Sequence, residues 1–267
     1  MTTLLRSYLM SECRRLMTRS LPSAAQSAGA PPRSGIHMCV ARRATPRGGA
    51  PAPRAYVSCL DCKWPPETRE CWKCKRVTDR MREMFFCTPC DVVQSPDPAA
   101  NYFDVMGIAA TFDIDLAQLR SRYRDLQTKL HPDKYAQKSD TERAYSALQS
   151  TAVNKAYWRL ADPLKRGLYL LELNGMGFRD GEVEVDEGFL LDVMETNEAM
   201  AAAASVEALA AIGEENEREM AALVRDVAAA FADDDVTRAR WLLACMKYRD
   251  NIGDKIKQIR QERFGIV

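Results

Sequence analysis

Residues 115–163 read DLAQLRSRYRDLQTKLHPDKYAQKSDTERAYSALQSTAVNKAYWRLADP and carry the clearest structural pattern in the chain. In the first part of this segment apolar residues recur every three or four positions, which is the spacing of one face of an α-helix. Cationic and polar residues follow the same spacing beside this stripe. We therefore expect an amphipathic helix that opens at Asp115 and has one basic face. The apolar stripe is Leu116, Leu119, Tyr123, Leu126 and Leu130, and the basic face is Arg120, Arg124, Gln127 and His131.

The triplet His131-Pro132-Asp133 should end this helix, because proline disfavours helical geometry in the residue before it. A second helix should open at Ser139, with Glu142 placed as in a capping box. Two helices joined by a short loop pack antiparallel through their apolar stripes. The segment thus predicts a helical hairpin whose connecting loop contains His-Pro-Asp. The second helix is expected to run through Leu148, Ala152, Ala156 and Leu160 to Asp162-Pro163.

Helical periodicity dominates the rest of the chain beyond residue 95, where alternating strand patterns are nearly absent. Three more helices are expected over about residues 187–204, 205–232 and 235–263, and these could form a small antiparallel bundle. The predicted fold is mostly α: a helical hairpin plus a C-terminal three-helix bundle, preceded by a small cysteine-rich segment that is zinc-ribbon-like. The expected parts are residues 1–55, 56–95, 101–174 and 186–263, and proline-containing stretches at 46–53 and 95–98 separate the first three of them.

The hairpin and its flanks resemble the J domain. In that family the loop and the basic helix face dock on a DnaK-type ATPase and stimulate ATP hydrolysis. Proline makes such a loop rigid and so presents its neighbours at low entropic cost. The matching stretches are NYFDVMG (101–107), LRSRYRDL (119–126), HPD (131–133) and VNKAYWRLADP (153–163). The resemblance implies chaperone-binding roles for His131, Pro132, Asp133, Arg120, Tyr123 and Arg124.

The sequence after the J-like segment narrows the resemblance. No Gly/Phe-rich linker follows; residues 163–171 (PLKRGLYLL) continue directly, and an acidic helical region comes next. This combination resembles the HscB/Jac type, the iron–sulfur cluster co-chaperones, over about residues 71–263. The resemblance implies a protein that is not an enzyme. It would bind the cluster scaffold protein, deliver it to a DnaK-type mitochondrial chaperone and stimulate that chaperone's ATPase to promote cluster transfer.

The helix that begins at Glu187 carries more large apolar residues than one core face can use. Phe189, Val193 and Met200 are spaced to face a core, and a wide core face is one explanation for the others. In the HscB type this helix, with an aromatic residue from the last helix, contacts the scaffold protein. That aromatic residue, Tyr248, also fits a core stripe, so both roles stay open for it. The scaffold-binding residues implied by position are Leu190, Leu191, Met194, Glu195, Glu198 and Tyr248.

Four cysteines form two Cys-x-x-Cys pairs, Cys71 with Cys74 and Cys87 with Cys90, separated by twelve residues. This spacing suits four thiolates around one tetrahedral Zn²⁺ ion. The chain has nine cysteines, and an odd number without a secretory signal argues against a disulfide framework. We expect a structural zinc, with residues 84–86 as a short strand that leads into the second pair. Cys59 and Cys62 form a further pair whose role stays open.

The first 55 residues differ sharply from the remainder. They hold nine of the 38 basic residues of the chain but only one of its 37 acidic residues, Glu12. Such an Arg-, Ser- and Ala-rich segment is typical of a mitochondrial transit peptide. It predicts a location in the mitochondrial matrix, and an additional cytosolic pool is compatible with it. A disordered basic tail is the alternative.

The competing functions are a zinc-ribbon nucleic-acid binder with a helical body and an enzyme. The body after residue 55 is acidic, whereas phosphate binding needs a retained basic face. Catalysis by a nucleophile needs a nearby base, and the only histidines are His37 and His131. We therefore expect no nucleic-acid partner and no catalytic residues. No apolar run is long enough for a transmembrane helix, so no membrane partner is expected.

Overall fold

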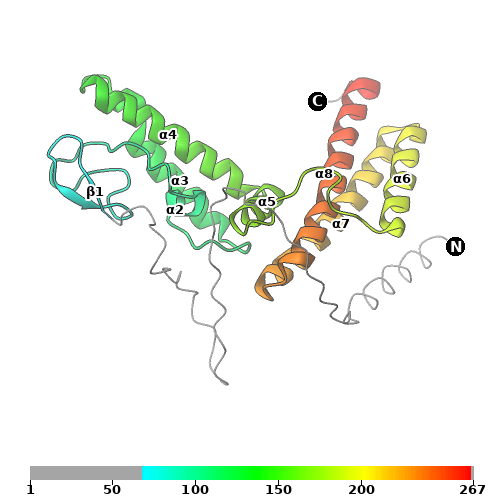
Figure 1. Ribbon diagram of the computed structural model, residues 1–267. Helices are drawn as coiled ribbons and strands as arrows, with labels where there is room; N and C mark the ends of the chain where they lie inside the picture. Colours follow the sequence, from blue (N-terminus) through cyan, green and yellow to red (C-terminus); the bar gives the residue numbers. More distant parts are fainter. Residues whose placement is uncertain (1–67, 266–267) are drawn as a thin grey trace, which may run out of the picture. The chain divides into compact units, whose positions relative to one another are not determined.

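The computed structural model describes residues 68–265 (Figure 1). The predicted transit segment and the pair Cys59 and Cys62 lie outside these residues. Among the described helices, none combines the length and the apolar character needed to cross a bilayer. The strands are β1 (Thr68–Glu70) and β2 (Val77–Asp79), followed by α2 (Tyr102–Met106), α3 (Leu116–Leu130), the 3-10 helix η1 (Pro132–Tyr135), α4 (Asp140–Ala161), α5 (Pro163–Leu173), α6 (Glu187–Ala202), α7 (Val206–Ala232) and α8 (Val236–Phe264).

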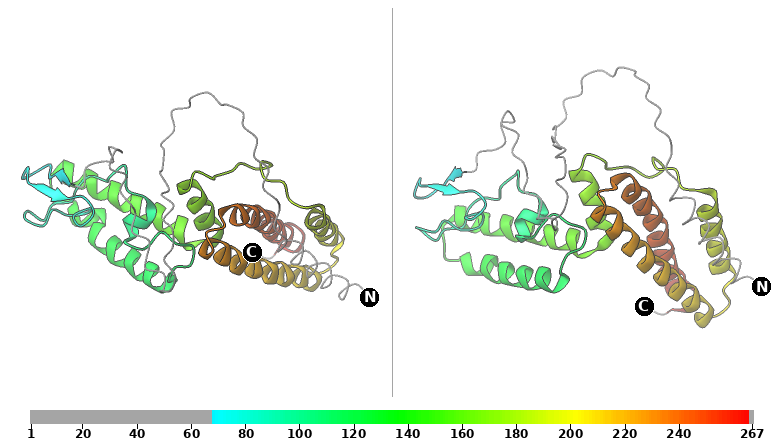
Figure 2. Two further views of the ribbon diagram at one scale, coloured as in Figure 1. Left: turned by 60° about the horizontal axis from the view of Figure 1, so that its bottom comes forward. Right: turned by 90° about the horizontal axis from the view of Figure 1, so that it is seen from below.

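Helices α3 and α4 form the expected hairpin and lie side by side in both views of Figure 2. Helix α3 begins after Asp115, whose carboxylate accepts hydrogen bonds from the backbone N–H groups of Ala117 and Gln118. Ser139 caps α4 by accepting from the N–H of Glu142. These caps satisfy N–H groups that have no partner inside a helix. Local sequence therefore sets both helix starts.

The predicted stripes of these two helices are wrong at two positions. Leu116 is 49% exposed and Leu148 is 54% exposed, so neither belongs to the core. The buried face of α4 begins with three polar residues, and two of them, Ser146 and Gln149, donate to backbone carbonyl groups of neighbouring segments. Apolar periodicity carries no signal for such contacts. The buried residues of α4 are Glu142, Ser146, Gln149, Val153, Ala156 and Leu160.

Helix α5 packs against α8 at close range. A Cβ atom on Gly167 would lie 2.5 Å from Cδ2 of Leu243, so only glycine fits there without a shift. Phe112, which precedes α3, stacks on Phe231 of α7 with ring centroids 5.5 Å apart. The core of the J-like region therefore continues into the end of α7 and the beginning of α8.

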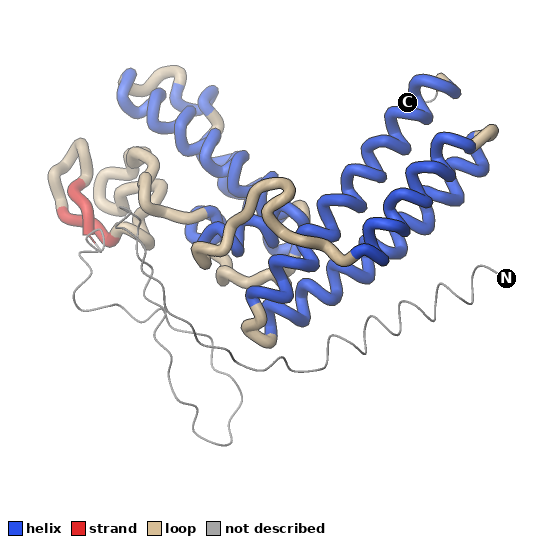
Figure 3. The backbone as a smooth tube through the Cα atoms, turned by 45° about the vertical axis from the view of Figure 1, so that its right-hand side comes forward, coloured by secondary structure: helices blue, strands red, loops and turns tan. Residues whose placement is uncertain are grey.

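Helices α6, α7 and α8 form the predicted bundle (Figure 3). Met200, Leu209 and Ile252, one from each helix, are nearly fully buried in a common cluster. The bundle and the hairpin confirm the prediction of a mostly helical fold. Such a fold is stable when each helix buries an apolar stripe against its neighbours.

The cysteine segment contains little regular structure. Strands β1 and β2 pair antiparallel, with Arg69 opposite Thr78. The strand expected over residues 84–86 is wrong: only Phe86 forms an isolated bridge, with Val93. The carbonyl oxygen of Met84 accepts from the side chains of Arg69 and Gln149 instead of from a neighbouring strand. Hydrogen bonds from side chains therefore take the place, at Met84, of the backbone hydrogen bonds that a strand would form with its neighbour.

Candidate functional site

The His-Pro-Asp loop projects from the hairpin as the turn η1. The side chains of His131 and Asp133 are 57% and 90% exposed, and Nδ1 of His131 lies 3.5 Å from Oδ2 of Asp133. The same Nδ1 accepts a hydrogen bond of 3.3 Å from the backbone N–H of Asp133. Tyr135 anchors the turn, since its ring is buried and its hydroxyl donates to the carbonyl of Lys129 at 3.0 Å. A fixed turn thus holds two polar side chains out toward solvent.

The predicted chaperone-binding residues of α3 are only partly available for a partner. Arg120 and Arg124 are exposed, as a docking face requires. Tyr123 is half-buried: its hydroxyl donates to Oδ1 of Asn154 at 2.9 Å, and its ring stacks on Tyr157 at 4.2 Å. The structure therefore brings His131, Asp133 and the two arginines to the surface, whereas Tyr123 ties α3 to α4.

The predicted scaffold-binding residues on α6 divide into exposed and half-buried groups. Leu191 is 57% and Met194 is 59% exposed, and Glu195 and Glu198 beside them are exposed as well. Leu190 is half-buried. We call the exposed group of Leu191, Met194, Glu195 and Glu198 the α6 face. Two exposed apolar side chains next to carboxylates are typical of a binding surface rather than a core.

Tyr248 lies between core and surface. It is half-buried on α8, and its ring meets Phe189 of α6 edge-on, with centroids 6.0 Å apart. Such edge-to-face pairs are favourable beyond their buried area. Tyr248 therefore takes part in joining α8 to α6.

Sequence reasoning missed Arg249, which fixes α6 to the bundle. Its side chain is 3% exposed and pairs with Asp192 of α6 and with Glu219 of α7, the latter at 2.6 Å. Its guanidinium also lies over the ring of Phe189, 5.3 Å from the centroid. One arginine among the several of this helix gives no sequence signal of burial. In the folded bundle it links the three helices next to the α6 face.

The four predicted metal ligands meet at one point. The sulfur atoms of Cys71, Cys74, Cys87 and Cys90 lie within 4.8 Å of one another. The Cys71–Cys90 and Cys74–Cys87 sulfur pairs are each 3.7 Å apart. A tetrahedral ion with Zn–S bonds of about 2.3 Å has an edge of about 3.8 Å, whereas a disulfide is about 2.05 Å long. The quartet therefore fits a tetrahedral metal and could hold one.

The protonation of this quartet also favours a cation. Burial raises the pKa of Cys71, but N–H groups of Cys74, Lys73 and Gln94 that donate to its sulfur outweigh this, and the pKa falls to about 6. Burial and the neighbouring thiols raise the pKa of Cys87 to about 12. The sulfur of Cys71 thus ionises readily, while those of Cys87 and Cys90, whose pKa values burial raises, resist ionisation unless a positive ion is present.

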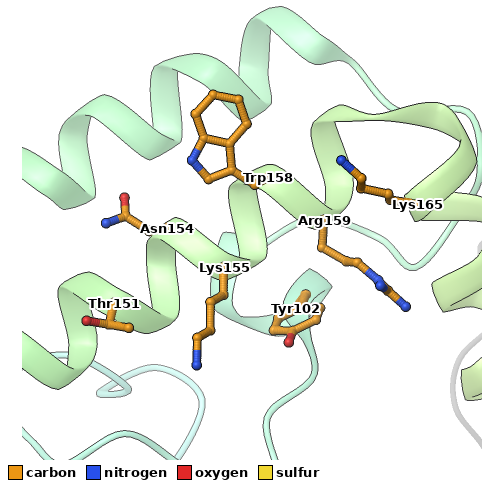
Figure 4. A pocket seen from close by; sticks show the side chains of 7 residues that line it. All are labelled: Tyr102, Thr151, Asn154, Lys155, Trp158, Arg159 and Lys165. Atoms are coloured by element: carbon orange, nitrogen blue, oxygen red, sulfur yellow. The ribbon is translucent and has the colours of Figure 1, made fainter. Parts of the chain in front are cut away.

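A separate hollow of about 390 Å³ lies along α4 (Figure 4). Tyr102 and Trp158 line it, and Lys155, Arg159 and Lys165 lie along its edge. Trp158 is 65% exposed and meets Tyr157 edge-on. Arg159 pairs with Glu172, so part of this positive charge is compensated. None of the predicted site residues lines this hollow.

Comparisons with known proteins match the two helical regions separately. A family model described as the DnaJ domain matches residues 101–169. A second, described as the HSCB C-terminal oligomerisation domain, matches residues 185–257. The human iron–sulfur cluster co-chaperone protein HscB is 40% identical over 189 residues, which cover 70% of this chain and 80% of that protein. The homologue from Arabidopsis thaliana is 35% identical over 133 residues, or 50% of this chain and 51% of that protein.

Solved structures agree with this picture. The crystal structure of human co-chaperone protein HscB has a TM-score of 0.68 and 39% identity, and the match covers 72% of this chain and 98% of that one. Chaperone HscB from Vibrio cholerae has a TM-score of 0.54 and 27% identity, with coverage of 61% and 99%. The match thus spans nearly all of both solved chains.

Proposed function

Because the chain belongs to the HscB family of iron–sulfur cluster co-chaperones, we propose that it binds the cluster scaffold protein, delivers it to a DnaK-type chaperone and stimulates that chaperone's ATPase. The relatives are co-chaperones and not enzymes. One observation carries the proposal: the same chain exposes His131 and Asp133 on its J domain and an apolar, acidic α6 face on its bundle.

The proposed action of the J domain is recognition. The loop offers a carboxylate and an imidazole, and Arg120 and Arg124 add positive charge on the same domain. Such charges raise the rate of encounter with an acidic surface and select its orientation. The rigid turn lowers the entropy lost when the loop docks. The chemistry of ATP hydrolysis remains that of the chaperone.

The α6 face defines the chemistry of the second partner. Leu191 and Met194 stand one turn apart on α6 and are mostly exposed. Glu195 and Glu198 border them with negative charge. Such a surface fits a partner that has an apolar groove with a basic rim. For an iron–sulfur co-chaperone, that partner is the cluster scaffold protein.

Replacing Leu191 and Met194 together with serine should weaken scaffold binding by more than about 2 kcal/mol, or roughly thirtyfold in Kd, as the loss of interface anchors does. Because both side chains are more than half exposed, the melting temperature should change little. Calorimetric titration with the scaffold protein, alongside thermal melting, measures the two effects.

Leu148→Ser provides the matched control, because Leu148 is a similarly exposed leucine on the J domain. It should leave scaffold affinity unchanged. A large fall in the melting temperature of the double variant would show that the α6 face belongs to the core. Unchanged affinity in a stable double variant would remove the scaffold assignment from these residues.

We also propose that the cysteine quartet holds one structural Zn²⁺ ion through Cys71, Cys74, Cys87 and Cys90. The segment has only two three-residue strands, so metal binding would supply much of its folding free energy. Purified protein should contain one zinc per chain, and Cys87→Ser should abolish it, while Cys245→Ala should keep it. Elemental analysis measures this, and protein free of both zinc and iron would contradict the assignment.

The location follows from the basic N-terminal segment. We propose that residues 1–55 direct the protein to the mitochondrial matrix, where its DnaK-type partner would be the mitochondrial chaperone. The support is the nine arginines and the single acidic residue of this segment.

A further inference from the structure

The cysteine segment and helix α4 share a buried polar contact that none of the proposed sites uses. Gln149 of α4 is 2% exposed, and its Nε2 donates to the carbonyl oxygens of Met84 and Gln94 at 3.1 and 3.0 Å. These two residues stand on opposite arms of the turn that carries Cys87 and Cys90. The N–H of Gln94 donates to Phe85, which joins the arms. One J-domain side chain thus fastens both arms.

The same arm reaches a metal ligand. Nε2 of Gln94, itself 2% exposed, donates to Sγ of Cys71 at 3.4 Å and to the carbonyl of Val92 at 3.1 Å. Gln94 therefore contacts Cys71 through its side chain and Gln149 through its backbone. A continuous chain of hydrogen bonds runs from a sulfur of the quartet to helix α4.

Aromatic and apolar contacts follow the same path. Nε1 of Trp72, the residue after Cys71, donates to the carbonyl of Val93 at 2.8 Å, and its ring meets Tyr145 at 5.9 Å. Tyr145 lies one turn before Gln149 on α4, so both are on one helix face. Met84, Phe85 and Val93 belong to the same buried cluster as the J-domain core.

This region of α4 also supports the His-Pro-Asp loop. Oγ of Ser146 donates at 2.7 Å to the carbonyl of Leu130, the residue before His131. Ser146 is fully buried and lies within one turn of Gln149. A displacement of α4 near the cysteine segment would therefore also displace the end of α3, where the His-Pro-Asp loop begins.

We propose that Gln149 is a positioning residue that couples the metal knuckles to helix α4, so that a bound metal stabilises the J domain as well as the cysteine segment. The inference rests on the metal site proposed above. A metal fixes the sulfurs and hence the two arms that accept from Gln149. Without it the arms are held by few backbone bonds, and their opening removes both acceptors and part of the shared core.

Gln149→Leu tests this coupling, because leucine keeps much of the volume but cannot donate. Gln127→Leu is the matched control: Gln127 donates to the carbonyl of Ser150 and to Oδ1 of Asn154, and these two hydrogen bonds join α3 to α4 without involving the cysteine segment. In full-length, zinc-loaded protein, transfer of zinc to an excess of a coloured chelator should be about tenfold faster in the Gln149 variant, since two hydrogen bonds are lost from the closed state. The Gln127 variant should release zinc at the wild-type rate.

Hydrogen exchange gives a readout independent of release. Stripping zinc from the wild-type chain should speed exchange in the cysteine segment and in residues 140–153 of α4. In Gln149→Leu the effect on α4 should disappear. Should this variant fail to fold, Gln149→Asn, which keeps a shorter amide, should release zinc at an intermediate rate.

Equal rates of zinc release from the wild-type, Gln149 and Gln127 proteins would overturn the coupling. A wild-type chain that binds no zinc would overturn the metal assignment and the coupling together. A zinc-loaded wild type with unchanged α4 exchange would overturn the coupling alone, so the two failures are distinguishable.

Discussion

Asp133→Asn should abolish stimulation of the DnaK-type chaperone's ATPase while the fold survives. The side chain is 90% exposed and lies 3.5 Å from the imidazole of His131, so the change removes a charge and leaves the shape of the turn. Charge-assisted hydrogen bonds are roughly twice as strong as neutral ones, and this carboxylate is presented on a rigid turn. The free energy of unfolding should change by no more than about 0.5 kcal/mol, so the melting temperature should stay nearly constant. Steady-state ATPase assays of the chaperone with and without the variant measure the effect, and His131→Gln should behave in the same way.

Asp140→Asn is the control for this prediction. Asp140 is 93% exposed, opens α4 and pairs with Arg143 on the same helix, outside the loop. It should stimulate the chaperone as the wild type does. Undiminished stimulation by Asp133→Asn would refute the proposed role of the J domain, whereas loss in both variants would indicate a general effect of charge.

Arg249→Leu should destabilise the bundle by about 3 kcal/mol, because removing one member of a buried ion cluster leaves its partners uncompensated. Asp192 and Glu219 would then face each other near the ring of Phe189 without the guanidinium that now lies between them. For a cooperative unit of about 200 residues this corresponds to a fall in melting temperature of about 6–12 °C. Differential scanning calorimetry measures the fall.

The same variant should weaken scaffold binding, because Asp192 lies next to Leu191 on α6 and its pairing helps to position that helix. Arg260→Leu on the exposed side of α8 should change neither property by more than about 0.5 kcal/mol. A melting temperature equal to that of the Arg260 variant would contradict the structural role of the Arg249 cluster. Chaperone stimulation by the J domain should persist at temperatures where the variant is folded.

The sequence by itself determined the helices and their limits, because caps and breakers act over a few residues. Asp115, Ser139 and Pro163 start helices through local hydrogen bonds or fixed backbone angles, wherever the chain packs. The exposed His-Pro-Asp turn and the grouping of Cys71, Cys74, Cys87 and Cys90 were predictable for the same reason, since each depends on short spacing. The proposed partners came from the resemblance to the HscB/Jac type, because the hydrophobic pattern of a sequence does not identify a binding partner.

Only the tertiary structure decided which faces are buried and how the parts are joined. The sequence placed Leu116 and Leu148 in the core, yet both are largely exposed. Burial of Gln149 and Arg249 depends on acceptors and carboxylates that come from distant segments: Met84 and Gln94 in one case, Asp192 and Glu219 in the other. A polar side chain becomes stable inside a protein when folding brings it partners, and hydrophobic periodicity records only apolar burial.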